Sequence, residues 1–167
     1  MKNFLKTICI LWLAGFTSIL IFSCSKDETK EKKSPAFADI QLNDIKQKAT
    51  AMTSTSLVIS NSGGVVWKAG DVFIYKTASG NYGKFQVVSV TVSENYKLTI
   101  NAITFKQDGT ILSINSAMPV RGTWFGDLDA TKEAGDDGTE DFKNNRLTNT
   151  DTEFAPLHGA VFVKYSL

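Results

Sequence analysis

The sequence predicts a mainly β domain, an antiparallel meander that closes as a small sandwich or barrel, with one short helix before it. Three observations support this class. From residue 55 onward, short runs rich in apolar and β-branched residues alternate with turns rich in Gly, Asn and Asp. One of these runs is apolar on both faces. Before residue 53, the apolar residues instead recur at helical spacing.

The helix is expected within Phe37–Met52. Its apolar residues recur at spacings of four and three and would form one helical face: Ala38, Leu42, Ile45, Ala49 and Met52. Asn43 is a possible cap if the helix starts late. The alternative is a strand over Phe37–Leu42, because residues 50–56 are rich in poor helix formers. The short helix is favoured.

The first strand is expected at Ser56–Ser60, and Asn61–Gly64 would then turn the chain into Val65–Trp67. The next strand, Asp71–Thr77, places Val72 and Ile74 on one face and Phe73 and Tyr75 on the other. A strand that is apolar on both faces favours a sandwich or a closed barrel over an open sheet.

The meander continues through two further hairpins. A turn at Ala78–Asn81 leads into Tyr82–Val92, where Val88, Val90 and Val92 are expected to share a face. Later strands are expected at Tyr96–Phe105, Thr110–Ile114 and Ala160–Tyr165.

The N-terminal residues read as an export signal. Lys2 and Lys6 precede an uncharged apolar run, Thr7–Phe22, which is short for a membrane-spanning helix of about 20 residues. Ile21, Phe22, Ser23 and Cys24 follow, and the chain then turns polar. This resembles the lipobox of bacterial lipoproteins, although Phe22 is bulkier than usual there. The alternative is an uncleaved signal-anchor helix.

The lipobox resemblance implies that residues 1–23 are removed and that Cys24 becomes the lipid-bearing first residue, carrying acyl chains such as palmitate. Ser25, Lys26, Asp27 and Glu28 resemble the export tetrad of surface lipoproteins of the Bacteroidota. That implies an outer-membrane protein displayed at the cell surface. The alternative is that these four residues are only part of an ordinary solvated tether. In either case residues 24–36 are expected to form a flexible tether, which leads to a single domain at 37–167.

Composition excludes several function classes. Cys9 lies in the apolar run, so the mature chain would have no free thiol for catalysis or for a thiolate metal site. Without Lys2 and Lys6, 16 basic residues face 17 acidic ones. Such a balance provides no electrostatic footprint for nucleic acid and no polybasic patch for anionic lipid.

Residues 74–77 and 80–84, Ile-Tyr-Lys-Thr and Gly-Asn-Tyr-Gly-Lys, are similar to a segment of the haem-binding HmuY lipoproteins. That family implies haem held by two histidines. This chain contains one histidine, His158, so the ligand pair does not carry over.

The segment Gly126–Asp141 is strongly acidic. Besides Glu133 it holds six candidate Ca²⁺ ligands: Asp127, Asp129, Asp136, Asp137, Glu140 and Asp141. The EF-hand spacing fails, because Lys132 and Gly138 occupy the positions that need glycine and glutamate. The favoured alternative is a solvated loop that repulsion between carboxylates keeps open and mobile.

Two further residues are candidates for ligand binding, and no catalytic motif accompanies them. Trp124 lies between two glycines beside the acidic segment, and His158 precedes the last strand. The sequence therefore favours a non-catalytic binding module for a small molecule, a glycan or a protein partner. The alternatives are an accessory subunit of an outer-membrane complex or, less favoured, a haem-binding or hydrolytic lipoprotein.

Overall fold

The computed structural model describes residues 36–60 and 66–165, of which the side chains of 58–60 are left undescribed. The expected signal peptide, Cys24, the export tetrad and nearly all of the tether lie outside these residues, as does the expected turn at Asn61–Gly64. The described residues belong to one compact unit, Lys32–Leu167.

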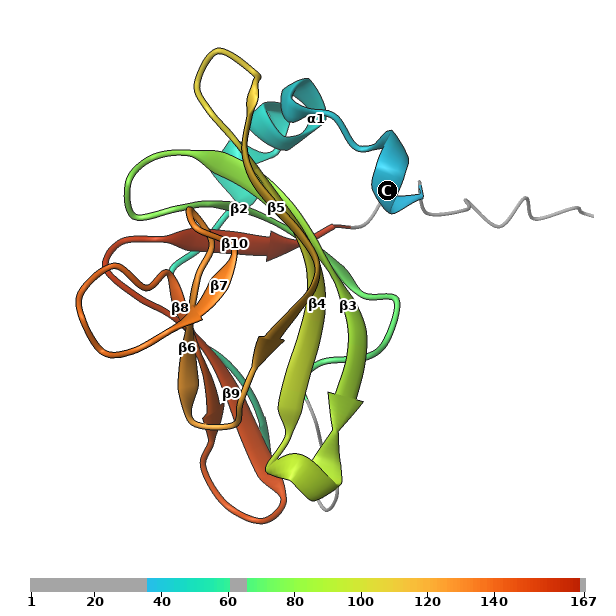
Figure 1. Ribbon diagram of the computed structural model, residues 1–167, viewed down its shortest axis with the longest axis vertical. Coiled ribbons are helices and arrows are strands. Elements are labelled where there is room, and N and C mark those ends of the chain that lie inside the picture. The colour runs from blue at the N-terminus through green and yellow to red at the C-terminus, as the bar shows by residue number, and fades with distance from the viewer. Residues whose placement is uncertain (1–35, 61–65, 166–167) are drawn as a thin grey trace, which may run out of the picture. The chain divides into compact units, whose positions relative to one another are not determined.

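Two antiparallel five-stranded sheets pack together, so the predicted mainly β class is confirmed (Figure 1). Sheet I has the strand order β10 (Val161–Lys164), β2 (Val72–Lys76), β3 (Tyr82–Thr91), β4 (Lys97–Phe105) and β5 (Ile111–Val120). Sheet II has the order β1 (Leu57–Ser60), β9 (Asp151–Pro156), β8 (Phe142–Arg146), β6 (Trp124–Asp127) and β7 (Lys132–Ala134).

The core between the sheets is dominated by aromatic rings. Its rings come from five strands and the segment before β2: Trp67, Phe73, Tyr75, Phe85, Phe142, Phe154 and Phe162. Trp67 meets Phe154 edge-on with ring centroids 4.6 Å apart, and its indole N–H donates to Asn144 Oδ1 at 3.2 Å. The buried indole therefore combines apolar packing with a satisfied donor.

Strand β2 is buried on both faces, as its sequence predicts. Phe73 and Tyr75 point into the core between the sheets, whereas Val72 and Ile74 join a second cluster on the outer face of sheet I. The helix α1 (Leu42–Gln47) lies at this outer face and contributes Ile45 to the cluster. The outer cover removes Val72 and Ile74 from water, and packing between the sheets removes Phe73 and Tyr75.

The N-terminal helix is shorter than its pattern predicts, and its cap is a different residue. The 3₁₀ helices η1 (Phe37–Asp39) and η2 (Ala49–Ala51) flank α1. Gln41 rather than Asn43 is the N-cap, and its backbone N–H donates to Asp44 at 2.7 Å. Ala38 is exposed.

Ile45 of the expected apolar face is buried, but so are Phe37 and Ile40, which the helical spacing does not include. The carbonyls of Phe37 and Ile40 each accept a hydrogen bond of 2.6 Å from the buried ammonium of Lys84, on the sheet below. This tertiary contact fixes the η1 turn, which also excludes the alternative strand over Phe37–Leu42.

A bulge overturns the expected common face of Val88, Val90 and Val92. The register of β3 against β4 shifts between Val87 and Ser89. Val90 consequently packs against the core, whereas Val88 is exposed. The strand ends at Thr91, and Val92 starts the 3₁₀ helix η3 (Val92–Glu94). Strict alternation fails because the bulge inserts one residue.

Candidate functional site

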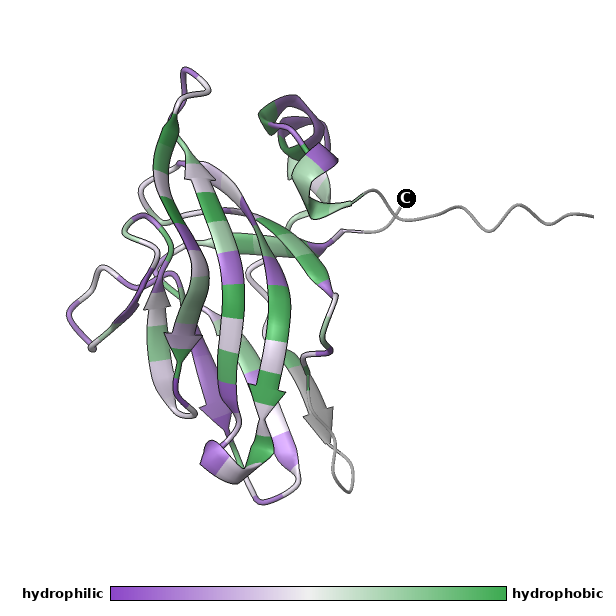
Figure 2. Ribbon diagram, turned by 45° about the vertical axis from the view of Figure 1, so that its right-hand side comes forward, coloured by the Kyte–Doolittle hydropathy of each residue, from purple (hydrophilic) through white to green (hydrophobic). Residues whose placement is uncertain are grey.

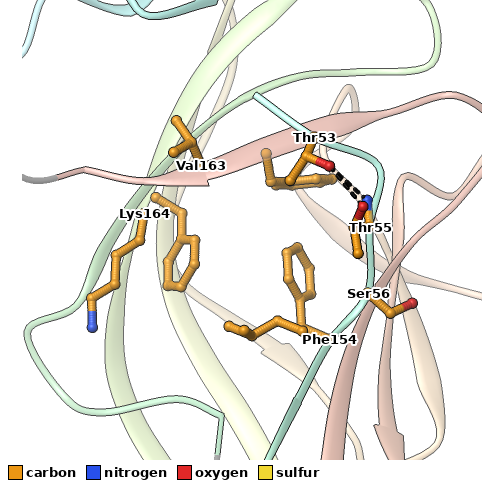
Figure 3. A pocket seen from close by; sticks show the side chains of 9 residues that line it. Thr53, Thr55, Ser56, Phe154, Val163 and Lys164 are labelled. Carbon is orange, nitrogen blue, oxygen red and sulfur yellow. Dashed lines mark hydrogen bonds between the residues drawn. The ribbon is translucent and has the colours of Figure 1, made fainter. Parts of the chain in front are cut away.

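A pocket of about 270 Å³ opens at one edge of the sandwich, between β1 of sheet II and β10 of sheet I (Figure 3). We call it the edge pocket. Its lining comes from both sheets and from the segment that leads into β1: Thr53, Thr55, Ser56, Leu57, Phe73, Phe154, Phe162, Val163 and Lys164.

The pocket exists because the two edge strands belong to different sheets and are not paired with each other. One bridge joins the preceding segment to β10: the backbone N–H groups of Thr53 and Phe162 each donate to the other's carbonyl at 2.9 Å. The chain then crosses to β1 and forms one wall of the pocket. Thr53 Oγ1 accepts from the backbone N–H of Thr55 at 3.0 Å, which shapes that wall (Figure 3).

The floor of the edge pocket is aromatic. Phe73, Phe154 and Phe162 come from β2, β9 and β10, and all three also belong to the core. Phe154 and Phe162 meet edge-on with centroids 4.7 Å apart. Leu57 adds an exposed apolar side chain at the mouth. This floor suits an apolar ring or a short chain.

The rim of the edge pocket is polar. Thr55 and Ser56 lie on one side and Lys164 on the other (Figure 3). The Lys164 ammonium is 2.7 Å from Asp71 Oδ1, and its side chain is about half exposed. Asp71 therefore neutralises part of the Lys164 charge, but the ammonium remains accessible to an anionic group that enters the mouth of the pocket.

Neither Trp124 nor His158 lines the edge pocket. Trp124 is exposed on β6, with the Arg121 guanidinium 3.9 Å from its ring centroid. Arg121 is in turn ion-paired with Glu133 at 2.6 Å. One face of the indole is therefore already covered by a cation, which leaves less of it for a sugar to stack on.

His158 is paired with a buried carboxylate. Its Nε2 is 3.0 Å from Glu140 Oε1. Burial disfavours the charge on Glu140, but hydrogen bonds from its own backbone N–H, from His158 and from the Gly138 N–H outweigh burial and lower its pKa to about 2. No hydroxyl is hydrogen-bonded to His158 within the described part of the chain, so these residues make a structural pair rather than a nucleophile and its base.

The acidic segment is not the open, mobile loop that the sequence favours. It contains the end of β6 and all of β7, and Asp127, Glu140 and Asp141 are buried. Asp141 Oδ1 accepts from the Ala78 N–H and Oδ2 from the Leu128 N–H, each at 2.8 Å. This carboxylate therefore ties the β2–β3 turn of sheet I to the end of β6 in sheet II.

The calcium hypothesis gains no support from residues 36–60 and 66–165, which contain no group of three or more His, Cys, Asp or Glu side chains placed to hold a metal ion. The candidate ligands have other partners. Asp129 accepts from Asn81 Nδ2 at 3.0 Å, and Asp137 accepts from Thr139 Oγ1 at 2.7 Å.

Sequence reasoning did not identify the edge pocket. Its one local signal is the run Thr53–Thr55, which lies between the expected helix and the expected first strand. The phenylalanines of the floor read only as core residues, because their position at a sheet edge depends on strand order.

Among the residues that the structure describes, no helix is long and apolar enough to cross a bilayer. Comparisons of the chain with family models, with curated proteins and with solved structures gave no match.

Proposed function

We propose that this protein is a lipid-anchored, non-catalytic binding protein of the bacterial outer membrane, which takes the apolar part of a small amphipathic molecule into the edge pocket. The observation that carries the proposal is the apolar pocket over Phe73, Phe154 and Phe162, at the edge where β1 and β10 are not paired with each other. The lipobox resemblance at Cys24 supports the anchor.

The pocket defines a class of ligand. A volume of about 270 Å³ lies just below the usual range for drug-sized ligands, so a single ring or a short alkyl chain fits best. Among the described residues that line the pocket, Lys164 is the one that carries a charge, which favours a carboxylate or another anion as the polar group of the ligand.

Binding without catalysis agrees with the residues that line this pocket. Its reactive groups are the hydroxyls of Thr53, Thr55 and Ser56 and the amine of Lys164. No carboxylate or imidazole among the lining residues could activate such a hydroxyl, which is a weak nucleophile by itself.

Calorimetric titration of the full-length lipoprotein in nanodiscs tests this proposal. The probes are 4-phenylbutyrate and the uncharged 4-phenylbutanol, with empty nanodiscs as the blank for partition into lipid. We expect saturable binding, tighter for the carboxylate. Thr55→Trp should fill the mouth and weaken binding by at least about tenfold, which corresponds to 1.4 kcal/mol.

The matched control is Thr50→Trp, which adds the same side chain at an exposed threonine of η2 outside the pocket. It should bind like the wild type. Absence of saturable binding to either probe, or equal binding by Thr55→Trp and the wild type, would overturn the assignment of the pocket.

A further inference from the structure

We propose that the outer face of β5, next to the β4–β5 turn, is the surface with which the anchored domain contacts the lipid bilayer. The inference rests on the lipid anchor of the proposed function and adds an orientation to it.

Two isoleucines form an uncovered apolar strip on this face. Ile111 and Ile114 are 54% and 60% exposed. Ile111 is paired with Phe105 and Ile114 with Ile103, and a bulge between the two pairs keeps both isoleucines on the outer face. We call Ile111 and Ile114 the β5 strip. Figure 2 shows strongly apolar residues where β5 begins.

The strip continues a surface that is covered elsewhere. Phe105 and Ile103 belong to the outer cluster beneath η1 and α1, together with Phe37, Ile40 and Ile45. The cover ends before the edge strand, and the side chains of β5 do not join that cluster. Exposed apolar residues that continue a buried cluster mark a contact surface more strongly than isolated ones.

The described part of the chain begins with a segment that contacts the β4–β5 turn. The first described residue is Ala36, immediately before η1. The Lys46 ammonium on α1 donates to the carbonyl of Gln107 in the β4–β5 turn at 3.2 Å. Leu42 of α1 and Gly109 of this turn also line the same small pocket, so the two segments lie side by side. The β5 strip therefore follows a turn that contacts the segment after the tether.

The length of the tether limits the distance between the domain and the membrane. Eleven residues separate Cys24 from Ala36, so they span at most roughly 40 Å when fully extended. Apart from Pro35, the residues Ser25–Pro35 carry no apolar side chain. The tether can hold the β5 strip close to the bilayer but has no large apolar side chain with which to cover it.

Apolar insertion rather than charge would drive this contact. Lys46 and Lys106 are exposed near the turn, but Asp44 and Asp108 lie there too. The expected contact is therefore shallow, at the boundary of headgroups and acyl chains some 5–10 Å deep, and it should occur on uncharged lipid and resist added salt.

A depth-dependent quenching experiment tests the orientation. Full-length lipoprotein carrying Ile114→Cys is labelled with a solvent-sensitive fluorophore and reconstituted into phosphatidylcholine vesicles with or without brominated acyl chains. An acylated Cys24 does not react, and Cys9 would leave with the signal, so the label has one site. The matched control is Val92→Cys in η3, a residue 55% exposed at the far end of β3.

We expect bromine to quench the label at Ile114, and at Ile111→Cys, but not at Val92. Equal quenching at both ends would overturn the orientation. So would a label at Ile114 that is shielded from water but not quenched, which would mean that a second copy or another protein covers the strip. Failure of the protein to join vesicles would instead contradict the anchor and with it the proposed function.

Discussion

Glu140 and Asp141 are neighbours in the chain and both are buried, yet their carboxyl pKa values are displaced in opposite directions. Glu140 receives hydrogen bonds from two backbone N–H groups and from His158, which bring its pKa to about 2. For Asp141, burial outweighs the bonds from Ala78 and Leu128, and Asp129 and Asp127 add repulsion, which together raise its pKa to about 6. The two residues therefore change the stability of the fold in opposite directions as the pH rises.

The raised pKa of Asp141 predicts a loss of stability as the pH rises from about 4 to about 6. The folded protein holds this proton more tightly than the unfolded chain, whose Asp has a pKa near 3.8, so the stabilisation is complete below that value and is lost through pH 6. Its size is about 3 kcal/mol. Urea unfolding at a series of pH values should show the loss in the wild type and not in Asp141→Asn. Parallel profiles for the two proteins would contradict this prediction.

The lowered pKa of Glu140 predicts the opposite pH dependence of stability. Its lowered pKa stabilises the fold above about pH 4.5, and this stabilisation is lost as the pH falls through 2. Glu140→Gln should lower the free energy of unfolding at pH 7 by about 1–3 kcal/mol, because Gly138 and His158 bind different carboxylate oxygens, whereas the uncharged Gln amide has a single oxygen and can accept from only one of them. The deficit should shrink near pH 2. A deficit that is the same at pH 7 and pH 2 would mean that packing rather than charge is responsible.

Lys84 holds the N-terminal segment to sheet I. Burial lowers the pKa of its ammonium, against the attraction of Asp39 and Asp44. The unfolded chain then binds this proton more tightly, so stability should rise with pH as the unfolded value of 10.5 is approached.

Lys84→Met should leave the carbonyls of Phe37 and Ile40 without their buried donor, at a cost of about 1–3 kcal/mol. Hydrogen exchange read by mass spectrometry should then speed up in residues 37–47 while β3 and β4 stay protected. Uniform loss of protection across the domain would show that Lys84 supports the whole sandwich instead.

Gly83 allows the Tyr75 ring to lie close against the backbone of β3. A Cβ built at Gly83 would be 2.3 Å from Tyr75 Cζ, well inside van der Waals contact. Gly83→Ala should therefore destabilise the protein by about 1–3 kcal/mol in urea unfolding, since the buried ring must shift. Gly135→Ala is the matched control, because its added Cβ meets no atom within 4 Å. Equal stability of the two variants would contradict the close approach.

Features that depend on neighbouring residues could be predicted from the sequence. The two-faced burial of β2, the hairpin at Gly80 and the mainly β class follow from alternation and turn chemistry over a few residues. The position of α1 could also be predicted approximately. Its cap could not, because packing of Phe37 and Ile40 around Lys84 decides where the chain turns.

The candidate site could not be predicted in the same way. Residue type alone makes Trp124 and His158 candidates, yet each is engaged by a nearby side chain, Arg121 and Glu140 respectively. The acidic segment was expected to be open because like charges repel. Backbone N–H donors from both sheets instead bury Asp141, and no local pattern reveals such donors.

By itself, the sequence determined the strand and turn alternation and the lipobox resemblance at Cys24, since both are written in adjacent residues. Only the tertiary structure decided which strands are edges, and with them the edge pocket and the β5 strip. Strand order depends on pairings between residues far apart in the chain, such as Leu57 with Phe154 and Phe162 with Tyr75. Such pairings are selected by the total burial of two packed sheets rather than by the preference of any one segment.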